Sequence, residues 1–109
     1  MDEARAWIEG VLGEKLGMCS LQEELKDGVA LGGVLNAIQP GIVPRMVSSS
    51  VPYKQMHNVE MYLATCKMLG VKELFSATDL LHHGNMEAVI ANIRAVAQMA
   101  ATRADFYGP

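Results

Sequence analysis

Histidine is the residue type in this sequence best suited to metal or acid–base chemistry, and its spacing fits neither. His82 and His83 are adjacent and follow Asp79. Neighbouring histidines on a helix point in divergent directions, whereas a tetrahedral metal site needs three or four converging ligands. We therefore interpret the pair as part of an exposed turn before Asn85 and expect no metal site.

The two cysteines, Cys19 and Cys66, are the next candidates. A cysteine nucleophile needs a histidine base and an electropositive pocket. Cys19, His57 and Cys66 are too scattered for their convergence to follow from spacing, and Cys66 lies on an apolar helical stripe. Cysteine is among the most buried residue types, so we expect both to be buried thiols in a reducing compartment.

Serines and glycines also fail to form a catalytic or phosphate-binding motif. The run Ser48 to Ser50 has no adjacent histidine and no strand-to-helix elbow, so it is typical of a loop. The early glycines follow no strand, and no Lys-Ser/Thr pair completes a phosphate loop. The sequence predicts neither an enzyme nor a cofactor site.

Composition indicates one soluble domain. The chain has 109 residues, half of them hydrophobic, which is enough for one core. Twelve acids against nine bases give a net charge of −3, which argues against nucleic-acid binding. The start carries no basic region followed by an apolar run, and the uncharged residues 28–44 are broken by glycine and proline. We expect a cytoplasmic protein without a membrane span.

Apolar residues recur at three- and four-residue steps, which predicts helices. Four main helices are expected: from Glu3 to Leu12, from Gly28 to Pro40, from Tyr53 or Lys54 to Gly70, and after an Asn85 cap to Ala101. Brief helical turns should connect them, one capped by Ser20 and another by Thr78. No segment alternates with period two. The predicted fold class is all-α.

Two further features concern packing and charge. Gly32 and Gly33 lie inside a predicted helix, where glycine is unfavourable, so we expect a close helix crossing there. The nine lysines and arginines are dispersed along the sequence, and we interpret each as a solubilising charge.

Four segments together resemble the calponin homology (CH) domain, in particular its single-copy calponin- and transgelin-like type. The segments are Ala6-Trp7-Ile8-Glu9; Leu25-Lys26-Asp27-Gly28-Val29-Ala30-Leu31 with Leu35-Asn36-Ala37-Ile38; Tyr53-Lys54-Gln55-Met56-His57-Asn58-Val59 with Leu63; and Asp79-Leu80-Leu81 with Asn85-Met86 and Val89. The resemblance implies a CH domain over residues 1–101, with residues 102–109 as a tail or the start of a linker. It also implies one shared core that contains Trp7, Leu31, Leu35, Leu63 and Ile93.

The resemblance gives structural meaning to two unusual residues. It implies that Gly28 lets the backbone pack close to its neighbours, and that Asn36 makes a buried hydrogen bond to backbone. The chain departs from the family at Gly32-Gly33, where bulkier residues such as Cys-Lys are frequent, and this removes a possible basic contact.

The family implies a non-enzymatic interaction role. Tandem CH domains bind filamentous actin, some basic single copies bind microtubules, and calponin-type single copies more often act as adaptors. In actin-binding tandems, part of the contact surface matches residues 71–93 here. The candidate partner-binding residues are Lys72, Asn85, Met86 and Glu87 within this segment, and Arg94 directly after it.

Charge favours the adaptor role over the filament roles. Actin and tubulin are acidic, so a chain of net charge −3 gains little long-range attraction to them. We therefore expect a cytoskeleton-associated or signalling adaptor module that binds actin or an actin-associated protein, with weak or no filament affinity of its own. Direct binding or bundling of actin filaments is the alternative, and microtubule binding is a further one.

Overall fold

The computed structural model describes residues 2–82 and 84–103, and these residues form helices and loops without a strand. Four main helices have 10 to 17 residues and two short helices have five. The elements are α1 (Asp2–Leu12), α2 (Leu21–Leu25), α3 (Val29–Ile38), α4 (Pro52–Met68), α5 (Ala77–Leu81) and α6 (Met86–Ala101). The all-α prediction is confirmed. Within the described residues, no helix has both the length and the apolarity that crossing a membrane requires.

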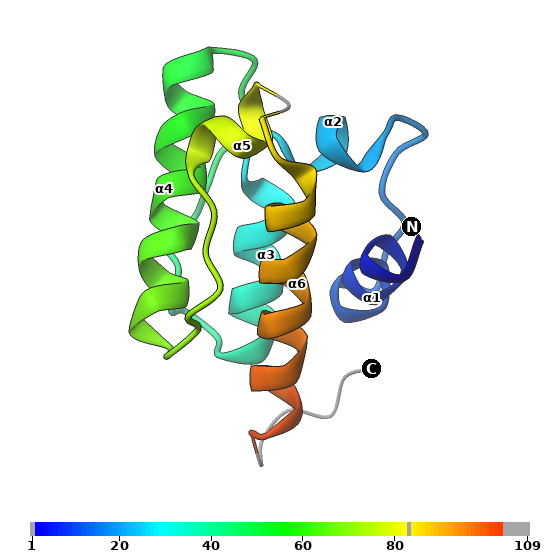
Figure 1. Cartoon of the computed structure of the whole chain (residues 1–109), viewed down its shortest axis with the longest axis vertical. Coiled ribbons are helices and arrows are strands. Elements are labelled where there is room, and N and C mark those ends of the chain that lie inside the picture. Colours follow the sequence, from blue (N-terminus) through cyan, green and yellow to red (C-terminus); the bar gives the residue numbers. More distant parts are fainter. Residues whose placement is uncertain (1, 83, 104–109) are drawn as a thin grey trace.

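Three of the main helices run in the same general direction. Figure 1 shows α3, α4 and α6 aligned along the long axis of the molecule, with α1 lying across them beside α6. Helix α3 packs against α1 on one side and α4 on the other, and α6 packs against α1 and α5. The short helices α2 and α5 contact each other and close the end of the bundle where α3, α4 and α6 begin.

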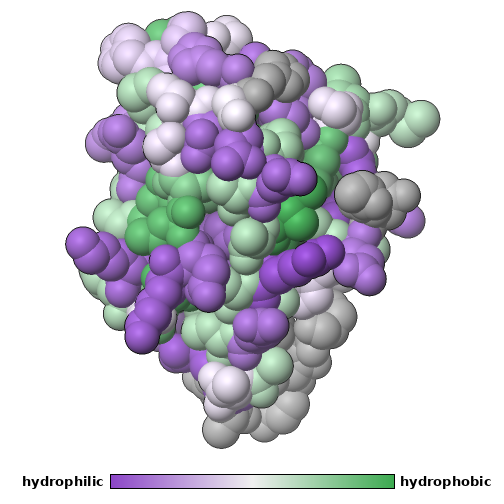
Figure 2. All heavy atoms as spheres, viewed as in Figure 1, coloured by the Kyte–Doolittle hydropathy of each residue, from purple (hydrophilic) through white to green (hydrophobic). Residues whose placement is uncertain are grey.

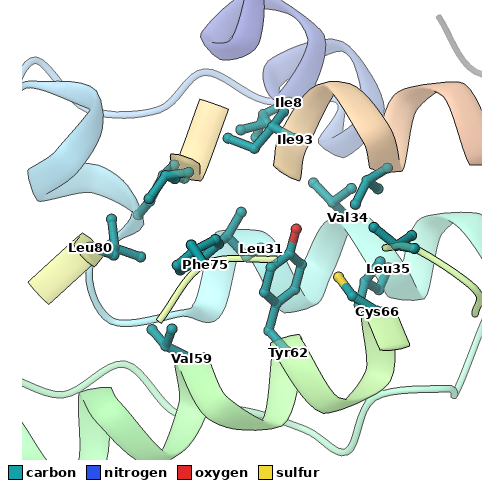
Figure 3. Packing of buried hydrophobic residues seen from close by; sticks show 14 of the residues in the cluster. Ile8, Leu31, Val34, Leu35, Val59, Tyr62, Cys66, Phe75, Leu80 and Ile93 are labelled. Carbon is teal, nitrogen blue, oxygen red and sulfur yellow. The ribbon is translucent and has the colours of Figure 1, made fainter. Parts of the chain in front are cut away.

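The core lies between the main helices. Leu31, Leu35 and Ile93 are buried in it, whereas Trp7 and Leu63 are half-buried and pack against its edge. Figure 3 shows side chains from α1, α3, α4 and α6 meeting at this centre. The largest fully buried side chains include Tyr62, Ile8, Leu25, Leu31, Leu35, Ile38 and Leu80.

Local side-chain chemistry sets where the helices begin. The Ser20 hydroxyl accepts a bond from the Glu23 amide at 3.3 Å, and Asn85 accepts one from the Ala88 amide at 3.1 Å, as the sequence predicts. The predicted cap of α5 is wrong: Ser76, not Thr78, occupies that position. Ser76 forms a capping box with Asp79, which satisfies amides that a later cap would leave unpaired.

Helix α4 begins at Pro52, slightly earlier than the sequence predicts. Proline suits this first position because its ring fixes φ and its missing N–H would have no helical partner there. Gly70 ends the helix with a φ of +90°, which glycine adopts without steric penalty. The predicted end of the helix is therefore confirmed.

Gly28 joins α2 to α3 where two backbones approach closely. Its φ is +80°, and a Cβ at this position would lie 2.8 Å from Asn58 Cβ and 3.0 Å from the backbone N of Val59. The expected role of Gly28 is thus confirmed. Gly33 faces Leu12 of α1, as a close helix crossing requires, whereas Gly32 faces Met46 of a loop.

Residues 102–103 follow α6 directly. The Arg103 guanidinium donates a hydrogen bond to Gln39 Oε1 at 2.6 Å, so the end of α6 is connected to the end of α3. The rest of the expected tail, residues 104–109, lies outside the described residues.

Candidate interaction surface

A thirteen-residue connection, residues 39–51, links the end of α3 to the start of α4 and is held by amide side chains. Asn36 makes two bonds to Val43: its Nδ2 donates to the carbonyl at 3.1 Å, and its Oδ1 accepts from the amide at 2.9 Å. The hydrogen bond to backbone that was expected of Asn36 is present. This pair fixes the first part of the loop against α3.

The second part of the loop is fixed by α4. Asn58 Nδ2 donates to the Val47 carbonyl at 3.2 Å and to the Asp27 carbonyl at 3.0 Å. Gln55 Nε2 donates to the Ser49 carbonyl at 2.8 Å. Asn58 and Gln55 are buried, so these bonds are partly shielded from water and hold the loop against α4.

The fixed loop presents apolar side chains to solvent. Val47 is 71% exposed and Tyr53, at the start of α4, is 72% exposed. Both line a hollow of about 370 Å³ together with Arg45, Lys54 and His57. We call these five residues the loop surface. In Figure 1 the loop runs behind α3 and α4 and reaches the upper end of α4.

The loop surface is locally positive on an acidic chain. Arg45 and Lys54 are exposed, and no acidic residue lines the hollow. Two bases that are nine positions apart in sequence therefore flank Val47 and Tyr53 in space. The interpretation of these bases as dispersed solubilising charges is incomplete, because the loop brings them to one place.

A second groove of about 360 Å³ meets the first at Arg45. It runs between α3 and the start of the loop, and its floor includes Gly32 and Gly33. The absence of side chains on these glycines leaves room beside the helix, and Met46 occupies part of that room. Arg45 therefore lines both hollows.

The sequence-predicted residues on α6 divide between structural and exposed positions. Asn85 caps the helix, and Met86 is half-buried against the core. Glu87 and Arg94 are exposed and seven positions apart, so they lie on one face of the helix. Arg94 also contacts Glu3 of α1 at 3.8 Å, in a pair that is largely exposed.

Lys72 lies on a different side of α6 from Arg94. The segment that carries Lys72 is joined to α6 where Asn92 Nδ2 donates to the Glu73 carbonyl at 2.7 Å. Asn92 and Arg94 are two positions apart, which places their side chains on opposite sides of the helix. Figure 2 shows this face of the molecule, where apolar patches on both sides of α6 are interrupted by polar side chains. The structure thus places Glu87 and Arg94 on one face of α6 and Lys72 on a different side.

A buried polar cluster that sequence reasoning missed joins α4 to α6. The Tyr62 hydroxyl donates to Asn92 Oδ1 at 2.6 Å, and Asn92 is fully buried. Burial raises the pKa of the Tyr62 hydroxyl and the pKa of the nearby Cys66 thiol, because their anions would lose hydration there. The only signal in the sequence is Asn92 on an otherwise apolar stripe.

The N-terminal loop, residues 13–20, is fixed by charged side chains. Glu24 accepts bonds from the Gly17 amide at 2.9 Å and the Cys19 amide at 3.1 Å, and these amides lower the pKa of its carboxyl group. Arg5 donates to the carbonyls of Gly17 and Cys19. The expectation that Cys19 is buried is wrong, because its backbone is bonded to polar side chains while its residue remains exposed.

The other candidates for chemistry do not come together in the described part of the chain. No group of three His, Cys, Asp or Glu residues there could hold a metal ion. His57 belongs to the loop surface and Cys66 to the core. His82 is exposed after α5, and His83 lies outside the described residues.

Comparison with known proteins decides the family. The sequence profile of the calponin homology (CH) domain matches residues 1–102. This chain belongs to the calponin homology domain family. Calponin-2 from Mus musculus is 37% identical over 103 residues, which cover 93% of this chain and 33% of that protein. Calponin-2 from Sus scrofa is 36% identical over 103 residues, which cover 93% of this chain and 34% of that protein.

Solved structures agree with this assignment. The calponin-homology domain of RNG2 from Schizosaccharomyces pombe has a TM-score of 0.80 and 28% identity, covering 92% of this chain and 65% of that chain. The calponin-homology domain of an IQGAP protein from the same organism has a TM-score of 0.78 at the same identity and coverage. The resemblance to a CH domain of calponin type is therefore confirmed. This domain spans about a third of the length of the calponin-2 relatives.

Proposed function

We propose that this domain is a non-enzymatic interaction module of a cytoskeleton-associated adaptor protein, and that the loop surface contacts an acidic partner. The supporting observation is the exposure of Val47 and Tyr53 beside Arg45 and Lys54. An apolar centre with a charged rim is the usual composition of a protein interface. Tyrosine and arginine are also the residue types that most often dominate binding energy.

Charge sets the expected strength of this contact. The net charge of −3 repels an acidic partner at long range, whereas Arg45 and Lys54 attract it within the Debye length of about 8–10 Å. We therefore propose weak, salt-sensitive affinity for actin filaments by the domain alone. Stronger attachment then requires residues outside this domain or an actin-associated protein.

Direct binding of actin filaments is the second candidate function. The gathering of Arg45, Lys54 and His57 on one surface favours it more than the sequence alone does. Microtubule binding is less well supported, because the same surface offers only two permanently charged bases. The exposed face of α6 with Glu87 and Arg94 is the competing contact surface, and its two opposite charges cancel.

Co-sedimentation with actin filaments tests the proposal and locates the surface. The variants R45E and R94E each change the net charge from −3 to −5, since one positive charge is removed and one negative charge is added. R45E places this change on the loop surface, whereas R94E places it on α6 and also removes the exposed contact with Glu3. At about 50 mM salt we expect R45E to weaken binding about tenfold and R94E to change it less than twofold.

Two outcomes would contradict the assignment of the surface. Equal losses in R45E and R94E would indicate that only net charge matters. A larger loss in R94E would place the contact on α6. A third variant, Y53A, changes no charge and should also weaken binding, because it removes an exposed aromatic side chain from the centre of the surface.

Very weak binding requires a more sensitive measurement. Adding actin filaments to the ¹⁵N-labelled domain should broaden amide signals selectively between residues 45 and 57. Broadening on α6 alone would refute the loop surface. If no amide signal of the domain is broadened, actin filaments are excluded as the acidic partner, and the adaptor role would involve another protein.

A further inference from the structure

The serine run in the loop contains one residue with the features of a phosphorylation site. Ser48 is exposed, and residues 44–49 have an irregular backbone without helix. Arg45 stands three positions before Ser48 and is exposed as well. Arginine-directed serine kinases bind substrates as exposed, irregular segments and use a basic side chain at that position to select the acceptor.

The two neighbouring serines lack this combination. Ser49 is half-buried, and its hydroxyl accepts a bond from the Val51 amide at 3.0 Å. Ser50 is exposed, but Val47 stands three positions before it. The structure therefore separates three adjacent serines into one candidate acceptor and two internal controls.

The Ser48 hydroxyl also has a contact that a phosphate would disrupt. It donates to Asp27 Oδ2 at 2.6 Å, while Asp27 Oδ1 accepts from the Val29 amide at 3.1 Å at the start of α3. Asp27 thus connects the loop to the α2–α3 junction. The contact needs a hydroxyl proton from Ser48, and a phosphoserine has no such proton to donate at that oxygen.

We propose that Ser48 is a phosphorylation site for an arginine-directed serine kinase, and that its phosphorylation releases the loop from Asp27. In this reaction Ser48 Oγ forms a bond to the γ-phosphorus of MgATP. The bond from that phosphorus to the oxygen it shares with the β-phosphorus breaks, and ADP leaves. The hydroxyl proton passes to a basic group of the kinase.

The release follows from charge. A phosphoserine carries about −1.5 to −2 charges at pH 7 and would stand against the Asp27 carboxylate, where like charges repel. The loop would then lose its contact with Asp27 and keep the bonds from Asn36, Asn58 and Gln55. The phosphate would also lie three positions from Arg45. An effect on partner binding, unlike the modification itself, rests on the function proposed above.

Kinase assays on the purified chain test the acceptor assignment without any cytoskeletal partner. A panel of arginine-directed serine kinases with MgATP should add one phosphoryl group, located by peptide fragmentation. We expect S48A to abolish incorporation, S50A to leave it unchanged, and R45A to lower kcat/KM about tenfold or more. Phosphate on Ser49 or Ser50, no incorporation by any kinase, or full activity towards R45A would overturn the assignment.

Amide hydrogen exchange tests the release. In the phosphorylated chain, exchange should become about tenfold faster at the Val29 amide, which donates to Asp27 Oδ1, and at the Val51 amide, which donates to Ser49 Oγ. The D27N variant keeps an acceptor at the same position but removes its charge. Phosphorylation should therefore accelerate exchange less in D27N than in the chain that has Asp27. Unchanged exchange in the phosphorylated chain would refute the release. Equal acceleration in S48A would show that the lost hydrogen bond, not charge repulsion, is responsible.

Discussion

Replacing Gly28 with alanine tests the close backbone approach between the α2–α3 junction and α4. Two separate penalties apply. A non-glycine residue at a φ of +80° costs about 1–2 kcal/mol, because its Cβ crowds the following carbonyl. The new Cβ would also lie 2.8 Å from Asn58 Cβ and 3.0 Å from two backbone atoms of α4, which cannot rotate away.

The expected loss is large compared with the stability of a domain. Overpacking of this kind costs about 1–3 kcal/mol. Alanine also restricts the unfolded chain, which returns about 0.4–1 kcal/mol. We therefore expect Gly28→Ala to lower the free energy of unfolding by about 2–4 kcal/mol, against a total of about 5–15 kcal/mol for a typical domain.

Gly41 provides a matched control. Its φ is +83°, but nothing lies within 4 Å of a Cβ built there. Gly41→Ala should therefore suffer only the backbone penalty, about 1 kcal/mol. The difference between the two variants isolates the steric contribution of the contact with α4.

Urea denaturation followed by circular dichroism measures both variants. With a slope of about 2 kcal/mol per molar urea, the midpoint of Gly28→Ala should fall by about 1–2 M and that of Gly41→Ala by about 0.5 M. Equal midpoints for the two variants would refute the reasoning, because the close approach to α4 would then have no energetic consequence. If Gly28→Ala is unfolded without urea while Gly41→Ala is folded, the loss in free energy of unfolding is already larger for Gly28→Ala.

Three further predictions concern the buried cluster and the cysteines. Asn92→Leu leaves the Tyr62 hydroxyl and the Glu73 carbonyl without their partner, so urea denaturation should show a loss of about 2–4 kcal/mol. If Asn92→Leu causes an equally large loss in a Tyr62→Phe background, the hydrogen bond between Tyr62 and Asn92 does not contribute to that loss. Because burial raises the folded pKa values of Tyr62 and Cys66, the unfolded chain releases these protons first. The free energy of unfolding should thus be unaffected by these two groups below about pH 8.5 and fall as pH rises through about 9–11. If the urea midpoint of a Tyr62→Phe, Cys66→Ala variant falls equally steeply with pH, the ionisation of these two groups is excluded as the cause. A thiol reagent should label the native chain once, at the exposed Cys19, and twice in denaturant; rapid native labelling of Cys66 by mass spectrometry would contradict its burial.

Local patterns in the sequence were sufficient to predict the helices. Apolar spacing indicated four main helices, and single residues such as Asn85 and Gly70 marked a start and an end. These predictions succeed because capping and amphipathic burial depend on residues within a few positions of one another. The predicted cap of α5 was wrong although the sequence distinguishes the two residues: Asp79 stands three positions after Ser76, as a capping box requires, whereas Leu81 stands three positions after Thr78.

The candidate site was less accessible from the sequence. Val47 lies in a serine- and proline-containing loop two positions after Arg45, and Tyr53 follows that loop next to Lys54. These neighbouring bases are the only local signal. Nothing in that pattern shows that the loop is held by Asn58 and Gln55, or that its apolar side chains face outward. Those facts depend on contacts between residues far apart in the chain.

The sequence alone determined that this chain is all-helical and resembles a calponin homology domain, because hydrophobic periodicity and glycine positions are local properties. The tertiary structure decided which charges act together. Arg45 and Lys54 meet at the loop surface, whereas Lys72 and Arg94 lie on different sides of α6. A charge count sums over the whole chain, but attraction between proteins acts over about one Debye length. Only the packing of α3, α4 and their loop could therefore show where an acidic chain is positive.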